Sequence, residues 1–346
     1  MVQAFTIDSM HCLSRNVITR FFSFLRGTAS QSLNKTLKNT EWLECGKTWK
    51  GLNFPIEFNR RPNSFKKWDS FKCTELRMFG LYGMDIIIRK FCPERVVQAA
   101  IYSLVIGMRI VSDPKLFRKH WRLAKSLFTS FLSNCAAKFV ERFISLAIHH
   151  IIHLPEETIR FNSPVDVLSC FKFENTLGIL KKAVKSRSHP LVNISKTLSS
   201  QNTFISNAGG QKKPTSLTKF PHVCKKIPSG EDNDAKYMTV YLRKFKLNVL
   251  READSFFSAR GKIRLLKYIQ IDEDGNILLY SSAFGRLVSA YYVLGEDSKK
   301  IFSMEARTCV VSNPEAIAAV SIKDVTQKYV VHSIYGSLFA YPLLHS

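Results

Sequence analysis

Paired cysteines are missing from this chain. Its 346 residues include eight cysteines, and none of them forms a Cys-x-x-Cys pair, the spacing that self-contained zinc modules commonly use. The cysteines are spread widely through apolar stretches, a distribution typical of buried free thiols in a reducing compartment. The sequence therefore predicts neither a zinc knuckle nor a disulfide-stapled secreted domain.

Signals for secretion and membrane insertion are missing as well. The first residues, MVQAFTIDSMHCLSRN, contain no basic start followed by an apolar run, so we expect no signal peptide. The longest apolar stretch, residues 96–111, is too short for a membrane span of roughly 20 residues and contains Arg109. We therefore expect no transmembrane helix, no membrane partner and an intracellular protein that is nuclear rather than cytoplasmic.

Acidic residues are scarce relative to basic ones. Lys and Arg number 51 against 27 Asp and Glu, which gives a formal net charge of +24. Hydrophobic residues make up 45% of the chain, so a sizeable core can form and disorder throughout is not expected. Such a basic chain favours an anionic partner, with nucleic acid ahead of an anionic membrane surface. The alternative is a basic surface that is only solvated.

The sequence pattern changes three times along the chain. Residues 1–55 have weak periodicity and predict a weakly ordered segment, with a short amphipathic helix around Phe21 to Leu25. Residues 56–195 have helical spacing, residues 196–235 predict a basic flexible linker, and residues 236–346 contain short β-rich runs. The expected fold class is α+β: a largely helical N-terminal region followed by a small C-terminal all-β barrel or sandwich.

Two local signals place individual elements. Residues 262–271 and 276–280 are β-rich runs on either side of Asp272-Glu273-Asp274-Gly275, and its Asp-Gly step predicts a hairpin turn. Residues 139–154 have helical spacing, and Pro155 predicts the end of that helix or a kink in it.

Acids are absent from one long segment. No Asp or Glu occurs between Glu174 and Glu231, whereas ten Lys or Arg residues do. A mobile basic tether suits phosphate contact without base readout, and a merely solvated linker explains the same charges equally well. The candidate nucleic-acid contacts in this segment are Lys181, Lys182, Lys185, Arg187, Lys212 and Lys213.

A polar stripe follows the otherwise apolar helix before Pro155. Arg142, His149 and His153 lie near one line at helical spacing, and buried polar groups on such a face need partners. The two histidines are four residues apart and could share a metal or a phosphate. A pair of hydrogen-bonded packing histidines is the simpler interpretation, because no third ligand lies nearby in the sequence.

A second helix beginning near Phe173 bears a carboxylate and lysines on one face. Glu174 lies at its N-terminal end, where the helix dipole favours a carboxylate, and Gly178 leaves room for a backbone to approach. Metal-dependent phosphodiester cleavage needs such a carboxylate, but it needs several of them. A capping glutamate above a solvated lysine face, Lys181 and Lys185, explains the pattern more simply. The expected buried stripe consists of Phe173, Leu177, Leu180 and Val184.

Residues 149–182 resemble the C-terminal portion of CACTA-type (En/Spm-like) cut-and-paste transposases and of the animal transposase-domain proteins derived from them. The family pattern is Asn-x-His-x-x-x-His-Leu, then Gly-Pro, then Ser-x-Phe-x-Phe-Glu-Asn-x-Leu-Gly-x-Leu-Lys. The matching positions are His149, His153, Leu154, Pro164, Ser169, Phe171, Phe173, Glu174, Asn175, Leu177, Gly178, Leu180 and Lys181.

The resemblance extends from about residue 55 to the end of the chain. Residues 58–62 and 71–77 look like the family's Phe-Asn-Arg-x-Pro and Trp-Lys-Ala-x-Glu-x-Arg steps, and residues 342–345 resemble the end of many animal members. The chain departs from the pattern at three positions: Ala147 replaces Asn, Ser163 replaces Gly, and Phe71 replaces Trp. Such drift suits a copy that is no longer held to transposition.

The resemblance implies an RNase H-like catalytic core in which two aspartates and a glutamate bind two magnesium ions. Glu174 matches the position of the glutamate and is the candidate relic catalytic and metal-binding acid. The two aspartates of the family precede everything that matches here, which implies a truncated copy. We expect no cofactor for this chain alone, and magnesium only if an intact catalytic core supplied the aspartates.

The leading hypothesis is a transposase-derived fragment that binds nucleic acid, DNA first, and has no autonomous nuclease activity. A second hypothesis is a protein-interaction scaffold that uses residues 236–346 to hold a protein partner. A third is a partial DDE nuclease that is completed in trans by another chain.

Overall fold

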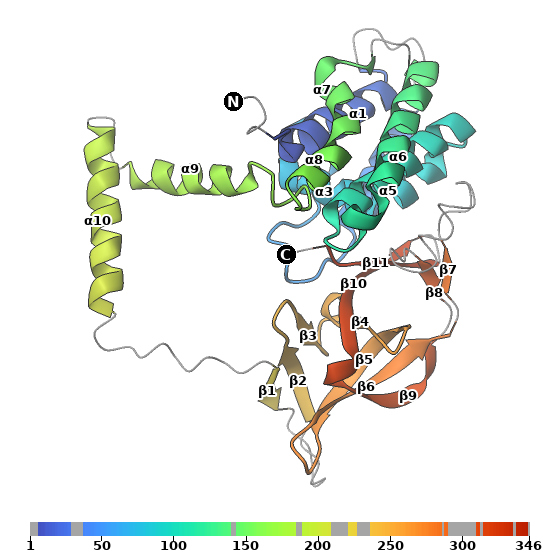
Figure 1. Cartoon of the computed structure of the whole chain (residues 1–346). Helices are drawn as coiled ribbons and strands as arrows, with labels where there is room; N and C mark the ends of the chain where they lie inside the picture. The colour runs from blue at the N-terminus through green and yellow to red at the C-terminus, as the bar shows by residue number, and fades with distance from the viewer. Residues whose placement is uncertain are drawn as a thin grey trace.

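The computed structural model describes residues 6–28, 37–139, 143–184, 189–208, 221–226, 236–285, 287–289, 309–311, 314–334 and 337–344. Helices come first and strands second, which confirms the α+β class (Figure 1). The described residues 6–208 contain helices and no strand, so they build no RNase H-like sheet.

The helical part is made of short elements around one long pair. Its elements are η2 (Met10–Ile18), α1 (Thr19–Leu25), α2 (Asn39–Lys50), η3 (Phe65–Ser70), α3 (Cys73–Tyr82), α4 (Met84–Ile87), η4 (Arg89–Phe91), α5 (Arg95–Ser112), α6 (Leu116–Phe139), α7 (Leu146–His149), η6 (His150–His153), α8 (Leu154–Arg160), α9 (Phe171–Ala183) and α10 (Pro190–Ala208).

The central pair is α5 against α6. Gly107 on α5 lets Phe128 of α6 approach closely, because a Cβ added at Gly107 would lie 2.5 Å from the ring. Helix α5 is long and apolar enough to span a membrane by composition, but 78% of that window is buried inside the protein. It therefore has the surroundings of a core helix.

The expectation of a weakly ordered segment over residues 1–55 is wrong for its described part. The short helix expected around Phe21 is confirmed as α1. Phe22 packs edge-on against Trp42 of α2 at 5.1 Å between ring centroids, and Trp49 packs against Phe79 of α3 at 4.9 Å. Aromatic burial orders this segment although its periodicity is weak.

The helix predicted over residues 139–154 is confirmed only for residues 146–154, which lie in α7, η6 and the start of α8. Helix α6 ends at Phe139, residues 140–142 lie outside the described residues, and Ser145 before α7 has an extended backbone. Pro155 occupies the first turn of α8 rather than ending a helix. Proline suits that position because the first helical N–H groups need no helical acceptor.

Helices α9 and α10 extend away from the helical body (Figure 1). The expected buried stripe of α9 is wrong, because the side chains of Phe173 and Leu177 are 69% and 63% exposed. The predicted linker, residues 196–235, is wrong at its start, since residues 196–208 belong to α10. Residues 209–220 and 227–235 lie outside the described residues.

The strands form one antiparallel sheet. They are β1 (His222–Lys226), β2 (Lys236–Tyr241), β3 (Lys246–Asn248), β4 (Phe256–Ala259), β5 (Lys262–Ile271), β6 (Ile277–Phe284), β7 (Leu287–Ser289), β8 (Cys309–Val311), β9 (Pro314–Ser321), β10 (Val325–Ile334) and β11 (Ser337–Pro342). The main path runs β1-β2-β5-β4-β10-β11-β8-β7 in the described residues, while β6 pairs with β5 and β9. The predicted hairpin is confirmed as β5–β6, and Gly275 in its turn has a φ of +80°.

The end of the chain packs into the helical core. Tyr341 of β11 and Leu344 beyond it belong to the same buried cluster as α5 and α6. The Tyr341 hydroxyl donates to Asp85 at 3.1 Å, and the Leu344 backbone N–H donates to the Tyr82 hydroxyl at 2.8 Å. These contacts fix the end of β11 beside α3, where a pocket lies.

Candidate functional site

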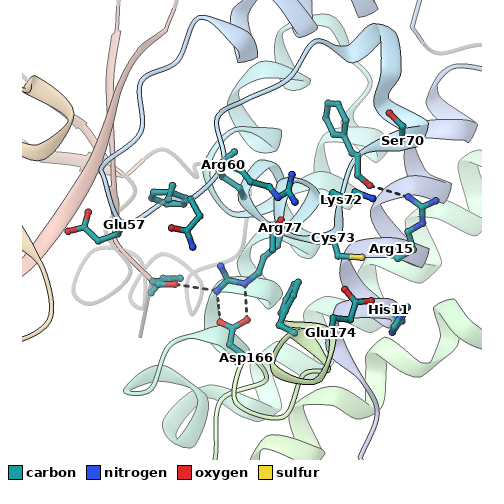
Figure 2. A pocket seen from close by; sticks show the side chains of 17 residues that line it. His11, Arg15, Glu57, Arg60, Ser70, Lys72, Cys73, Arg77, Asp166 and Glu174 are labelled. Carbon is teal, nitrogen blue, oxygen red and sulfur yellow. Dashed lines mark hydrogen bonds and ion pairs between the residues drawn. The ribbon is translucent and has the colours of Figure 1, made fainter. Parts of the chain in front are cut away.

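A pocket of about 950 Å³ opens where segments that are far apart in sequence meet (Figure 2). Its walls come from η2, the loop before η3, the start of α3, the start of α9 and the end of the chain. The lining residues are His11, Arg15, Glu57, Phe58, Asn59, Arg60, Ser70, Phe71, Lys72, Cys73, Thr74, Arg77, Met78, Asp166, Phe171, Glu174 and Leu344.

The starts of three helices, η2, α3 and α9, lie at this pocket and are capped by carboxylates. The Glu75 carboxylate accepts a hydrogen bond from the Lys72 backbone N–H at 3.0 Å and so caps the start of α3. Asp8 accepts from the Met10 backbone at 3.1 Å and from the Cys170 backbone at 2.9 Å, so it joins the start of η2 to the start of α9. These backbone hydrogen bonds, and the His11 side chain, hold the pKa of Asp8 below its ordinary value against the effect of burial.

A half-buried ion pair, Arg77 with Asp166, lines the pocket. The Arg77 guanidinium binds both carboxylate oxygens of Asp166, with Nε donating to Oδ1 at 2.8 Å. Arg77 also donates to the Leu344 carbonyl at 3.3 Å. Burial acts to lower the pKa of Arg77, but the Asp166 carboxylate keeps it above its ordinary value. Both charges of this pair are satisfied within the protein, so the pair positions the pocket walls.

Three further cations face the pocket without a carboxylate partner among the described residues. Arg15 is exposed and donates to the backbone carbonyls of Asp69 at 3.3 Å and Phe71 at 3.2 Å. Arg60 and Lys72 are exposed pocket residues. The carbonyl contacts orient the Arg15 guanidinium without neutralising it, so the pocket carries a local positive excess.

Glu174 is the one pocket carboxylate without a described ion-pair partner. Its side chain is exposed and points toward Cys73 in Figure 2. Burial raises the pKa of the Cys73 thiol, and the Glu174 carboxylate raises it further. Cys73 is therefore a neutral thiol near pH 7 and is a poor nucleophile.

A metal centre does not fit the described residues. No group of three His, Cys, Asp or Glu side chains that could hold a metal ion occurs among them. Asp166 is held by Arg77, and Asp8 is occupied by backbone N–H groups and His11. Glu174 alone offers fewer oxygens than magnesium requires, so no chemical step through a metal follows from this site.

The structure separates the polar stripe from the pocket. The rings of His149 and His153 lie 5.4 Å apart, and His153 Nδ1 is 3.7 Å from Glu156, yet neither histidine lines the pocket. Lys181 and Lys182 are exposed near the end of α9 and do not line it either. The other predicted site residues lie outside the described residues: Arg142, Lys185, Arg187, Lys212 and Lys213.

Three pocket residues could not be identified from sequence patterns. Arg15 and His11 belong to the segment that we expected to be weakly ordered, and no local pattern marks Asp166 as the partner of Arg77. By contrast, segments 58–60, 71–77 and 171–174, on which the resemblance rests, all contribute to the pocket.

No family model, no curated protein and no solved structure matches this chain.

Proposed function

We propose that this chain is a transposase-derived protein that binds nucleic acid, DNA first, and does not cleave it alone. One observation carries the proposal. Arg15, Arg60 and Lys72 face a single pocket, and none of them has a carboxylate partner among the described residues. A cluster of uncompensated cations on a chain of net charge +24 suits phosphate groups.

The geometry of the pocket suits phosphate in a second respect. Lys72, Cys73 and Thr74, at the start of α3, all line it, so the positive end of the helix dipole faces the ligand. Arg15 is held by two backbone carbonyls, and its planar guanidinium can bind phosphate oxygens in pairs. Such contacts bind the nucleic-acid backbone and do not read its sequence.

The proposed descent is supported by the convergence of the resembling segments. Segments 58–60 and 71–77 lie about a hundred residues before 171–174 in the sequence, yet all three line one pocket. Residues that served one site in an ancestral transposase would be expected to meet in this way.

The proposed lack of autonomous cleavage rests on the acids of the pocket. Glu174 is one carboxylate, and Asp166 is engaged by Arg77, whereas two-metal cleavage needs several free acids. Magnesium would have a role only if another chain supplied an intact catalytic core. A nuclear location accords with a DNA partner and is part of the same proposal.

A matched pair of triple variants tests the pocket. The variant Arg15→Gln, Arg60→Gln, Lys72→Gln removes the three pocket cations, and Lys47→Gln, Lys50→Gln, Lys115→Gln removes three exposed cations that do not line the pocket. We expect the first to weaken binding of a labelled duplex at least about tenfold and to reduce the salt dependence, whose slope is about 0.9 per phosphate contact. The second should change affinity less than about twofold. Equal losses in both, or no binding by the unaltered chain, would refute a pocket-specific role.

Cleavage is tested separately with supercoiled plasmid and magnesium. We expect the unaltered chain and Glu174→Gln to leave the plasmid equally intact. Nicking by the unaltered chain that Glu174→Gln abolishes would instead establish a nuclease and overturn this half of the proposal.

One observation favours a second candidate, a protein-interaction scaffold. The side chains of residues 314–319 on β9 are exposed, with Ile317 at 53%, and β9 pairs only with β6 in the described chain. Exposed edge strands can accept a strand from a partner. A pull-down with the full chain and with Ile317→Lys tests this candidate: a partner held through β9 should be lost in the variant.

A further inference from the structure

The outer face of the β5–β6 hairpin carries a stacked pair of tyrosines. Tyr268 and Tyr280 are direct cross-strand partners, and their rings lie 4.4 Å apart at an interplanar angle of 14°. The neighbouring pair, Ile269 and Leu279, faces the opposite way into a buried cluster. The tyrosines are only half-buried, so their rings form a platform on the side of the hairpin away from that cluster.

The two ends of this stack differ. At one end, the Lys236 ammonium lies 5.1 Å from the centroid of the Tyr268 ring, as a cation–π contact requires. At the other end, the cross-strand neighbour of Tyr280 on β9 is Ala319, which is exposed and has only a methyl group. Among the described residues, Tyr268 is the only ring that stacks on Tyr280, so no described ring stacks on the second face of Tyr280.

The exposed position over Ala319, beside the Tyr280 ring, is here named the slot. Ile317 and Ser321 flank Ala319 on the same face of β9, because alternate residues of a strand point the same way. In the described chain β9 pairs with β6 alone, so the slot opens at the sheet edge. Figure 1 places β6 and β9 at the end of the molecule away from the helices, where a ligand can reach them.

We propose that the slot over Ala319 binds a base of single-stranded nucleic acid, stacked on Tyr280. A tyrosine ring stacks on every base, so this contact does not require a particular sequence. Lys236 and Lys267, which is exposed in the bulge beside Tyr268, supply cations for the flanking phosphates. A duplex cannot use the slot, because its bases are stacked on one another. The inference rests on the proposed function only for the ligand class, nucleic acid.

Oligonucleotide binding by the full chain tests the slot. With oligo(dT) of about 12 nucleotides, we expect Tyr280→Ala to weaken binding by about 5- to 150-fold, the range for loss of one stacked base. Binding of a duplex of equal length should be unchanged. Tyr280→Phe, which keeps the ring, should bind as the unaltered chain does. Ala319→Leu, which fills the slot and keeps the tyrosines, should weaken single-strand binding alone.

Ring signals of labelled tyrosine, followed by NMR during titration with adenosine monophosphate, separate this inference from the pocket. We expect the Tyr280 signal to shift in the unaltered chain and in the pocket triple variant, but not in Ala319→Leu. DNA binding through the pocket with an unmoved Tyr280 signal would overturn the slot and leave the proposed function standing. A shifted Tyr280 signal together with single-strand binding, but with equal duplex binding by the pocket triple variant and its control, would support the slot and refute the pocket-specific role.

Discussion

His332 is a titratable side chain enclosed by aromatic rings. Its imidazole on β10 lies 4.7 Å from the Phe54 ring and 6.1 Å from the Tyr341 ring, and it is 2% exposed. Burial lowers its pKa from 6.5 to about 3, because a charged imidazolium would lose its hydration there. In the unfolded chain this histidine takes up a proton near its ordinary pKa.

Acid should therefore destabilise the protein through His332. Between about pH 6.5 and pH 3 the unfolded state binds a proton that the folded state does not, so stability falls as pH falls. The contribution is about 1.4 kcal/mol per pH unit within that window and vanishes above it. Urea unfolding at a series of pH values measures this slope. His332→Gln should remove it, whereas His149→Gln, at an exposed position, should keep it; equal slopes in both variants would contradict the assignment.

At the residue scale, sequence patterns identified a pocket residue but not the residues that lie beside it in the fold. Glu174 was singled out, and it does line the pocket. Its neighbours there, Arg15 and His11, lie about 160 residues earlier in the sequence, and no periodicity links residues so far apart. The histidine pair His149 and His153 was also singled out by local spacing, but the fold places it away from the pocket.

At the scale of elements, the sequence predicts a structure correctly where neighbouring residues alone determine the backbone conformation. The Asp-Gly turn of the β5–β6 hairpin was predicted because few residues other than glycine adopt the φ of +80° found at Gly275. The helix predicted to begin near Phe173 is confirmed as α9, but the prediction that its apolar stripe is buried is wrong. Whether Phe173 is buried depends on the elements packed beside it, and the described chain leaves it 69% exposed.

The contact of α5 with α6 depends on a missing side chain. A Cβ at Gly107 would lie 2.5 Å from Cε1 and 2.9 Å from Cδ1 of Phe128, distances that a packed core does not tolerate. Gly178 on α9 is the matched contrast, because a Cβ added there would meet nothing within 4 Å. Both glycines lie inside helices, so their intrinsic effect on helix propensity is the same.

Gly107→Ala should therefore destabilise the protein although alanine is the better helix former. We expect a net loss of about 1–3 kcal/mol, because overpacking outweighs the gain of roughly 1 kcal/mol in propensity. Gly178→Ala should be neutral or stabilising by up to about 1 kcal/mol. Chemical unfolding of both variants gives the comparison. A Gly107→Ala variant as stable as the unaltered chain would show that α6 can move away without cost.

At the scale of the whole molecule, the last two strands share a core with the helices. The main buried cluster contains Val330, Ile334 and Phe339 from the last two strands together with the helical residues. Lys328 of β10 is fully buried and binds Glu57, before the helical η3, at 2.8 Å and Asp254 at 2.7 Å. Local sequence patterns predict two parts joined by a linker, because they cannot detect a contact such as Lys328 with Glu57, which are 271 positions apart.

Such a shared core predicts that the helices cannot stay folded without the last strand. Removing residues 337–346 takes Tyr341 and Leu344 out of the core, together with the hydrogen bonds that they donate to Asp85 and to the Tyr82 hydroxyl. We expect this variant to lose most of its near-ultraviolet circular dichroism signal and to unfold without a cooperative transition. Each buried contact that is lost costs on the order of kilocalories per mole, and the sum over several sites exceeds a typical stability of about 5–15 kcal/mol.

All four tryptophans lie before residue 139, so their fluorescence reports the helical part alone. In the full chain we expect the fluorescence and far-ultraviolet circular dichroism transitions to coincide. A tryptophan transition that survives the loss of β11 at the same denaturant concentration would show that the helical part folds independently of the sheet.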